Sequence, residues 1–256
     1  MNKSVQTYIK MKKNQNQLGP PRSSSFWTAS NTRPRGILRY EKIFGRGFIS
    51  TGGARTTEEF VDMLALLPGQ RVLDVGCGIG GGDFYMARKF GASVLGIDLS
   101  SNMVEIAMER SVEENLPSVQ FEVGDATRRL FPECSFDVVY SRDTILHIAD
   151  KLALFKQFYS WLKPGGKLLI SDYCCGEKPW TPAFQDYVKQ RGYILYTPPH
   201  SWRRRGLGVS GRRIGPPSLS RSSRRSCREQ RHCERSSFRS GRDQAAMEKK
   251  CSVYSF

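Results

Sequence analysis

The stretch RVLDVGCGIGGG, residues 71–82, decides the fold. Its first five residues are mostly apolar, as in a strand buried within a sheet, and the glycines that follow form a loop. The next segment, DFYMARKFG (83–91), has the composition of a helix that a glycine ends. A strand, a glycine loop and a helix in this order let the backbone turn tightly and approach a ligand closely.

Apolar strands and amphipathic helices alternate on both sides of this stretch. The sequence predicts strands at 93–100, 119–126, 136–143 and 167–174, and helices at 37–44, 56–67, 102–115 and 152–166, with a short helix at ILHI (145–148). The strands are near-continuous runs of Val, Leu and Ile, as in strands buried on both faces. This alternation predicts an α/β protein with an open, mostly parallel central sheet flanked by helices.

The net charge of +16 lies at the two ends of the chain. Residues 1–35 contain seven Lys/Arg and no Asp/Glu, and residues 200–256 contain fifteen Lys/Arg and four Asp/Glu. The middle, 36–199, has 18 Lys/Arg and 20 Asp/Glu and is slightly acidic. Basic tails bind nucleic acid through phosphate contacts. This chain has no regular RGG or RS repeat and few aromatic residues in its tail, so we do not expect nucleic-acid binding.

Three regions follow from this division: a polar N-terminal extension (1–35), one domain (36–199), and a basic tail (200–256). We expect the extension and the tail to be disordered. No apolar run approaches the roughly 20 residues of a membrane span, and the N-terminus has no apolar signal region. We therefore expect no membrane insertion. The seven cysteines form no CxxC pair, so we predict no metal site and a reducing, cytoplasmic location.

Acidic residues follow the predicted strands at the positions where a nucleoside would bind. Asp74 directly precedes the glycines, where a carboxylate can support the loop and the cationic methionyl end of a ligand. Asp98 ends the next strand, 22 residues after Gly76, where it can bind both ribose hydroxyls. Asp125 ends the third strand, where it can meet the adenine amino group. The glycine loop and Asp98 also suit a dinucleotide, but the whole set favours S-adenosylmethionine.

These elements, followed in order by FDVVYSRDTILHI and LKPGG, resemble a class I S-adenosylmethionine-dependent methyltransferase with a Rossmann-like fold. Within SRDTILHI (141–148), Asp143 and His147 are four residues apart, so a helix there would place both on one face. A histidine oriented by a carboxylate is a base. The alternative is that Asp143 caps a helix and His147 is a satisfied structural histidine.

A closer resemblance covers about residues 36–199. The segments RYEKIFGRGFISTGG, VLDVGCGIGGGDFYMARKFG, YSRDTILHI, LKPGGKLLISDYC and YVKQRGY are similar to phosphoethanolamine N-methyltransferases, in particular to the vertebrate-type or second-domain form. The resemblance implies stepwise N-methylation of phosphoethanolamine or its mono- and dimethyl derivatives towards phosphocholine, by a monomer. A methyltransferase for another small molecule, of the sterol or quinone type, is the alternative; such enzymes lack the FISTGG and YVKQRGY segments.

The resemblance also implies site residues. The catalytic set is Asp143, His147 and, at the active-site lid, Tyr40; the phosphobase set is Tyr173, Tyr187, Arg191 and Tyr193. The cofactor set comprises Ile49, Ser50, Gly76, Asp98, Leu99, Asp125, Ala126 and Arg142, to which the loop itself adds Asp74 and Gly78. For the tyrosines, plain core packing is the alternative.

The sequence departs from the family after residue 199. The family continues with acidic helices, whereas SWRRRGLGVSGRRIGPPSLSRSSRRS has no core pattern. With one choice of codons, a one-base shift converts the segment that begins at Trp202 into LEEAGFRGVRAED. We therefore interpret residues 200–256 as out of frame and expect the C-terminal part of the fold to be missing, which leaves an exposed sheet edge. An inactive, truncated chain that binds only the cofactor is the corresponding alternative.

Overall fold

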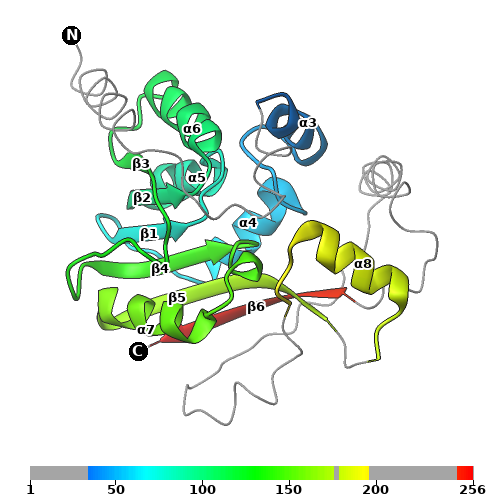
Figure 1. Cartoon of the computed structure of the whole chain (residues 1–256). Coiled ribbons are helices and arrows are strands. Elements are labelled where there is room, and N and C mark those ends of the chain that lie inside the picture. The colour runs from blue at the N-terminus through cyan, green and yellow to red at the C-terminus, as the bar shows by residue number, and fades with distance from the viewer. Residues whose placement is uncertain (1–33, 176–178, 196–246, 256) are drawn as a thin grey trace.

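The computed structural model describes residues 34–175, 179–195 and 247–255 (Figure 1). Six strands form one sheet in the order β3-β2-β1-β4-β5-β6. They are β1 (Arg71–Val75), β2 (Ser93–Asp98), β3 (Val119–Val123), β4 (Phe136–Arg142), β5 (Leu162–Cys175) and β6 (Met247–Ser255). The first five strands are parallel and β6 is antiparallel to β5. The predicted α/β class with a mostly parallel sheet is confirmed.

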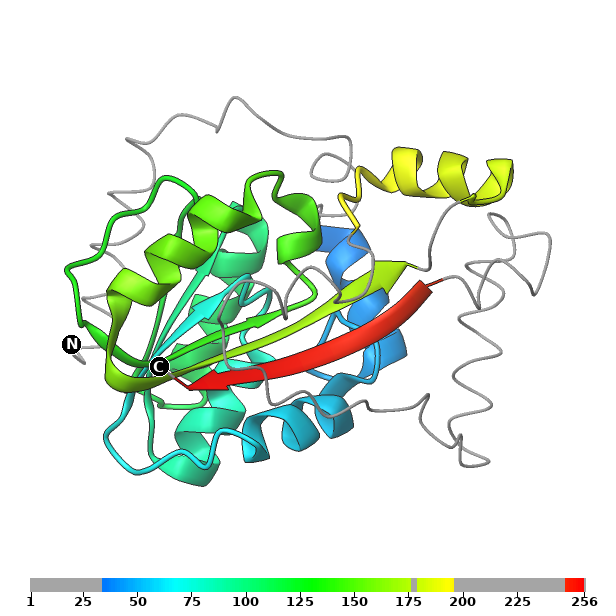
Figure 2. The same cartoon turned by 90° about the horizontal axis from the view of Figure 1, so that it is seen from below.

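Helices cover both faces of the sheet (Figures 1 and 2). They are α3 (Pro34–Phe44), α4 (Gly53–Asp62), α5 (Gly81–Phe90), α6 (Ser101–Glu113), α7 (Lys151–Trp161) and α8 (Pro182–Arg191), with a 3-10 turn η1 (Ile145–His147). Helices α4, α5 and α6 pack on one face and α7 packs on the other. Val72 of β1 belongs to the first of these two cores, and its neighbours Leu73 and Val75 belong to the second. The strands are thus buried on both faces, which explains their continuous apolar runs.

The order of the strands reverses at β1. After β1 the chain builds β2 and β3 on one side of it, and then returns to place β4 on its other side. In open parallel sheets, ligands bind at the carboxyl ends of the strands where such a reversal occurs. Predicted site residues stand at this edge on three strands: Gly76 directly follows β1, Asp98 ends β2 and Asp143 directly follows β4.

The helices next to this edge begin at capping side chains. Ser100 accepts a hydrogen bond from the Met103 backbone N–H (3.4 Å) at the start of α6. Asp150 does the same for Ala153 (2.9 Å) at the start of α7, and Thr181 for Phe184 (3.2 Å) at the start of α8. Each oxygen satisfies an N–H group that has no partner within its helix, so the sequence fixes where these helices start.

The structure differs from the sequence prediction at ILHI. Instead of an α-helix, Ile145–His147 forms one 3-10 turn, and Asp143 lies outside it in the left-handed backbone region (φ 53°). The prediction that Asp143 and His147 share one face of a helix is therefore wrong. The reason is a tertiary contact: the Asp143 backbone N–H donates to Ser171 O (2.7 Å) on β5, which continues the sheet pairing past the end of β4.

The predicted helix over 152–166 ends earlier, at Trp161. Leu162 is already extended (ψ 138°) and pairs with Phe136 of β4, so the Lys-Pro-Gly-Gly segment belongs to β5. The pairing of β4 with β5 shifts register between Phe136 and Val138, which accommodates this segment as an irregularity in the strand.

The predicted exposed edge at β5 is also wrong. Strand β6 pairs with β5 from Lys167↔Ser255 to Cys175↔Met247 and lies beside this part of it (Figure 2). The expectation that the whole tail is disordered is wrong for residues 247–255, because they supply the strand that we expected to be missing. The interpretation of an altered reading frame concerns mainly residues 196–246, which lie outside the described residues. The expected N-terminal disorder concerns residues 1–33, which lie outside them too.

Gly80 offers a test of the packing below the glycine loop. Its φ is 86°, and an added Cβ would lie 2.7 Å from Phe121 Cζ and 2.9 Å from two ring atoms of Phe84. We expect Gly80→Ala to lower the free energy of unfolding by about 1–3 kcal/mol more than Gly69→Ala does, because only the first substitution overpacks the core. Gly69 has a similar φ of 79° and open space around it, so it controls for backbone strain. If urea unfolding gives the same loss of unfolding free energy for both variants, Gly80 is needed only for its backbone conformation and not for the space that it leaves.

Candidate active site

Asp98 organises the glycine loop through backbone amides. Its Oδ2 accepts from the Gly78 N–H (3.0 Å) and its Oδ1 from the Ser100 N–H (2.8 Å). The loop is also joined to β2 because the N–H groups of Gly76 and Cys77 both donate to Ile97 O (2.7 and 3.1 Å). Burial raises the pKa of Asp98, and the two amide hydrogen bonds oppose that shift. The loop, the end of β2 and the start of α6 thus form one unit around the carboxylate.

One glycine of the loop has no room for a side chain, and a second has little room. A Cβ on Gly76 (φ 83°) would collide with the side chain of Thr144, and a Cβ on Gly78 (φ 56°) would lie 3.0 Å from Ile49 Cδ1. The structure therefore brings the predicted residues Ile49, Gly76 and Gly78 together. It adds Thr144, which sequence reasoning missed because only the turn after β4 places it against the loop.

Asp74, at the end of β1, is paired with a second acid that sequence reasoning also missed. Asp74 is 3% exposed and Asp83, in the first turn of α5, is completely buried. The two carboxyl groups are close enough that the charge of Asp74 disfavours ionisation of Asp83. Burial raises the pKa of both groups. Asp83 was visible in the sequence as an acid just after the glycines, but nothing there indicated that it meets Asp74.

The other predicted cofactor residues lie at the same edge of the sheet. Leu99 is 42% exposed beside Asp98, whereas Ala126 is buried against the core below it. Asp125 Oδ1 accepts from the N–H (2.9 Å) and the hydroxyl (2.6 Å) of Thr127, which holds the turn after β3. Ser50 O accepts from the Gly53 N–H (3.1 Å) at the start of α4.

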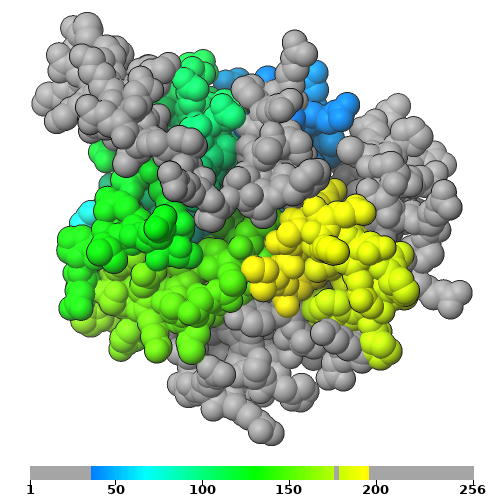
Figure 3. All heavy atoms as spheres, viewed as in Figure 1, coloured from blue at the N-terminus to red at the C-terminus, as the bar shows by residue number. Residues whose placement is uncertain are grey.

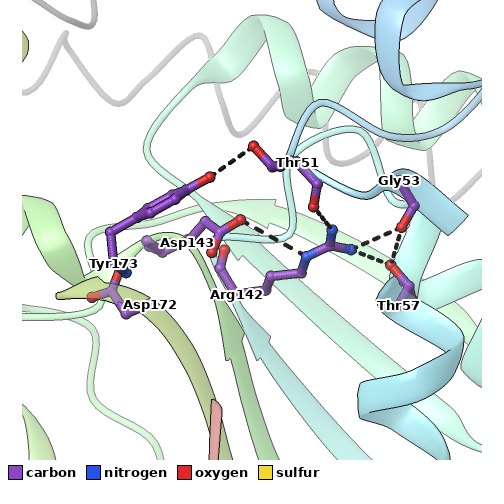
Figure 4. A network of polar contacts seen from close by, with 8 residues as sticks. Thr51, Gly53, Thr57, Arg142, Asp143, Asp172 and Tyr173 are labelled. Atoms are coloured by element: carbon purple, nitrogen blue, oxygen red, sulfur yellow. Dashed lines mark hydrogen bonds and ion pairs between the residues drawn. The ribbon is translucent and has the colours of Figure 1, made fainter. Parts of the chain in front are cut away.

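Arg142, at the end of β4, holds the loop that precedes α4 (Figure 4). Its guanidinium donates to Thr51 O (2.6 Å), to Gly53 O (3.2 Å) and to the hydroxyl of Thr57. Its Nε lies 3.9 Å from Asp143 Oδ2, and both side chains are more than 90% buried. Arg142, which we predicted as a cofactor contact, therefore positions the Thr51–Gly53 segment over the carboxyl ends of the strands.

Tyr173 of β5 joins the same network (Figure 4). Its hydroxyl donates to Thr51 Oγ1 (2.7 Å). Burial and then the charge of Asp143 raise the pKa of Tyr173 well above its ordinary value, so this phenol stays protonated. The predicted catalytic Asp143 and the predicted substrate residue Tyr173 are thus close together beneath the loop.

The remaining predicted substrate residues form one aromatic and cationic cluster. The Arg191 guanidinium hydrogen-bonds to Tyr40 of α3 and lies over the ring of Tyr187, 5.4 Å from its centroid. The hydroxyls of Tyr187 and Tyr193 share a hydrogen bond, and the Tyr193 and His147 rings are 5.3 Å apart. In the space-filling view, α8 and the residues just after it (yellow) lie against the green surface formed by the middle of the chain (Figure 3). The structure brings together five predicted residues from four segments of the chain.

His147 lies beside Tyr193 of this cluster. Burial and then the positive charge of Lys151 lower the pKa of His147 to about 4. Its ring also hydrogen-bonds to the backbone of Gly192, the residue that ends α8. A donor bond to a carbonyl fixes the imidazole tautomer and leaves the other nitrogen as an acceptor. The ring is therefore neutral near pH 7, in the state that can accept a proton.

Helix α3, which carries Tyr40, is fastened by a partly buried ion pair. Glu41 Oε1 lies 2.7 Å from Arg110 Nη1, and Glu41 Oε2 accepts from Arg110 Nη2 (2.9 Å) on α6. Glu41 Oε1 also accepts from the Gly47 N–H (2.7 Å), and Gly47 O in turn accepts from the Gly81 N–H (3.1 Å) at the start of α5. These contacts place the segment that contains Ile49 and Ser50 above the glycine loop.

Comparison with known proteins agrees with this geometry. Residues 72–166 match the family model described as a methyltransferase domain. The structure superposes with phosphoethanolamine N-methyltransferase 2 of Haemonchus contortus in complex with S-adenosyl-L-methionine, with a TM-score of 0.76 and 31% identity over 91% of this chain. The chain belongs to the class I methyltransferases. The predicted family and its Rossmann-like fold are confirmed.

The curated relatives carry the same enzyme name. This chain is 54% identical over 204 residues to phosphoethanolamine N-methyltransferase 1 of Arabidopsis thaliana. It is 46% identical over 165 residues to the phosphoethanolamine N-methyltransferase of Plasmodium falciparum (isolate 3D7). The aligned parts cover 76% and 63% of this chain, but only 41% and 61% of those relatives. The chain therefore spans about two fifths of the plant methyltransferase and about three fifths of the Plasmodium one.

Two further properties concern the described ranges only. Among residues 34–175, 179–195 and 247–255, no group of three or more His, Cys, Asp or Glu side chains is arranged to hold a metal ion. Over the same ranges, every helix is too short or too polar to cross a bilayer.

Arg142→Lys tests the role of the buried guanidinium. Lysine keeps the charge but loses the planar set of donors that reaches Thr51, Gly53 and Thr57. Hydrogen bonds to charged groups contribute about 1.5–3 kcal/mol each, so we expect amide exchange of residues 51–53 to accelerate by at least about tenfold. Arg55→Lys, on the exposed side of α4, is the matched control and should leave exchange unchanged. Unaltered exchange in Arg142→Lys would contradict this role.

Proposed function

We propose that this chain is an S-adenosylmethionine-dependent N-methyltransferase that acts on phosphoethanolamine, its mono- and dimethyl derivatives, or both. The observation that carries the proposal is the cluster formed by Tyr40, His147, Tyr187, Arg191 and Tyr193 beside the glycine loop. Such a cluster offers a cation and phenolic donors to a phosphate, and a neutral base to an ammonium group. A second Haemonchus contortus structure, of the protein in complex with phosphomonomethylethanolamine and S-adenosylhomocysteine, supports it with a TM-score of 0.75 and 30% identity.

The residues at the carboxyl ends of β1, β2 and β3 fit S-adenosylmethionine. The glycines of the Gly76–Gly80 loop have no Cβ, so the backbone there leaves room for a ligand to come close. Asp98 offers carboxylate oxygens to the ribose hydroxyls. The exposed Leu99 offers an apolar surface to adenine. Asp125 lies at the end of β3 for the adenine amino group. When bound, the cofactor supplies an electrophilic methyl group on a cationic sulfur.

The residues of the chain then prepare the amine for attack. An ammonium group has no lone pair, so it must first lose a proton, and the free nitrogen of the neutral His147 ring accepts it. A phosphate bound at Arg191 and the tyrosines brings negative charge close to His147, which favours the protonated imidazole and raises its pKa from the low value of the free chain. The remaining rate acceleration comes from holding the amine in line for attack and from excluding water.

Methyl transfer to phosphoethanolamine, phosphomonomethylethanolamine and phosphodimethylethanolamine is the direct test. Purified chain with radiolabelled S-adenosylmethionine should label at least one of the three. Labelling of none of them, in a chain shown to bind S-adenosylhomocysteine, would refute the substrate. The compartment and the oligomeric state stay predictions: a cytoplasmic monomer, which light scattering can test.

His147→Asn removes the proposed base and leaves the cofactor loop intact. We expect kcat to fall by about 10²–10⁴-fold, the usual contribution of a general base, while the affinity for S-adenosylhomocysteine stays within about threefold of wild type. Calorimetry and initial rates give both quantities. A parallel loss of cofactor affinity would instead assign His147 a structural role.

Arg191→Met removes the cation that lies over Tyr187 in the proposed phosphate site. We expect KM for the phosphobase to rise by at least about tenfold, since a charge-assisted contact to phosphate is lost. Lys189→Met, an exposed position in the last turn of the same helix, is the matched control and should change KM by less than twofold. Equal effects of both substitutions would point to general charge attraction and not to a built site.

A further inference from the structure

Lys151, the first residue of α7, is a buried cation outside the predicted site. It is only 1% exposed, although lysine is almost never fully buried without partners. Its Nζ donates to two backbone carbonyls, those of Ile148 and Ile194, both at 2.8 Å. One carbonyl directly follows the η1 turn, and the other follows α8 in the chain. Lys151 therefore joins two segments that the sequence separates by about 45 residues.

These two segments carry the proposed base and part of the phosphate site. His147 ends η1, and Tyr193 lies next to Ile194. A second link runs beside the first, because the Ile194 N–H donates to Leu146 O (2.7 Å). Between the two links, the rings of His147 and Tyr193 are 5.3 Å apart. The Lys151 contacts thus act together with this backbone hydrogen bond to hold the base at its distance from the phosphate site.

The charges around Lys151 come from two elements. His147 faces it from η1, and Asp172 and Cys174 face it from β5. Burial lowers the pKa of Lys151 to about 8, against the opposing effect of Asp172 and Cys174. The ammonium is therefore still charged at neutral pH, and its charge is one of the two causes that lower the pKa of His147.

We propose that Lys151 is a positioning residue for methyl transfer, which fixes the η1 turn to the segment after α8 and so sets His147 against the phosphate site. It acts through His147 and does not itself touch the substrate. The same ammonium discourages protonation of the imidazole before the substrate arrives. This inference rests on the proposed function, because it assigns Lys151 a part in that reaction.

Two substitutions separate the contacts of Lys151 from its charge. Lys151→Met removes both, whereas Lys151→Gln keeps N–H donors without the charge. The chain has only three histidines, so the ring signals of His147 can be assigned by NMR with the help of His147→Asn. We expect the His147 pKa to rise by about one unit in both Lys151 variants, because a nearby positive charge is lost. We expect kcat to fall by at least about tenfold in Lys151→Met and to recover partly in Lys151→Gln. Lys156→Met, exposed on the same helix, should change neither quantity.

The same coupling can be read in the unaltered chain. The His147 ring signals should shift as Lys151 loses its proton near pH 8. This titration decides the matter even if Lys151→Met fails to fold. The proposal would be overturned if the His147 pKa is unchanged in folded Lys151 variants. It would also be overturned if the His147 signals do not shift while Lys151 loses its proton.

These NMR experiments need no substrate. A chain that shows the coupling but methylates no phosphobase would refute the proposed function alone. A chain that methylates a phosphobase at the same rate with and without Lys151 would refute the role of Lys151 alone.

Discussion

The parallel pairing of β1 with β2 on one side and with β4 on the other is the constraint on which the site depends. In this register Asp74 lies between Gly96 and Tyr140, so the three strands end at nearly the same height. Their carboxyl ends bring together the glycine loop, Asp98 and Asp143, which lie far apart in the sequence. Because Gly96 has no Cβ, the buried carboxyl group of Asp83 fits beside β2; a Cβ there would lie 2.8 Å from its Oδ1. The sheet therefore decides both the position of the site and the polar groups below it.

Two kinds of interaction hold the elements around this edge in place. The glycine loop is fixed by backbone amides that donate to Ile97 and Asp98, within elements that share the main core. Helices α3 and α8 lie outside that core with small apolar clusters of their own, and polar links attach them: Glu41 with Arg110 for α3, and Lys151 for the segment after α8. A buried polar group that loses its partner costs free energy, so these links favour the one arrangement of the helices in which every partner is present.

The site also concentrates buried charge. Arg142, Lys151, Asp74 and Asp83 are each less than 10% exposed, and burial shifts the pKa of the last three towards the neutral form. Such groups lower the stability that an apolar core of the same volume would have, and they cluster where function requires them. Here the acids lie beneath the loop proposed to bind a cationic cofactor, and the lysine lies beside the proposed base.

The sequence by itself determined the α/β class, the glycine loop, the acids at the strand ends and the aromatic cluster, because local periodicity, glycine spacing and family motifs encode them. Only the tertiary structure decided the conformation of Asp143, the end of α7 and the pairing of β6 with β5. It also decided the partners of Arg142, Asp83 and Lys151. These features arise from contacts between residues far apart in the chain, and no pattern along one sequence specifies which buried polar groups will meet. The local signals could therefore name most of the site residues, but not the contacts that hold them in place.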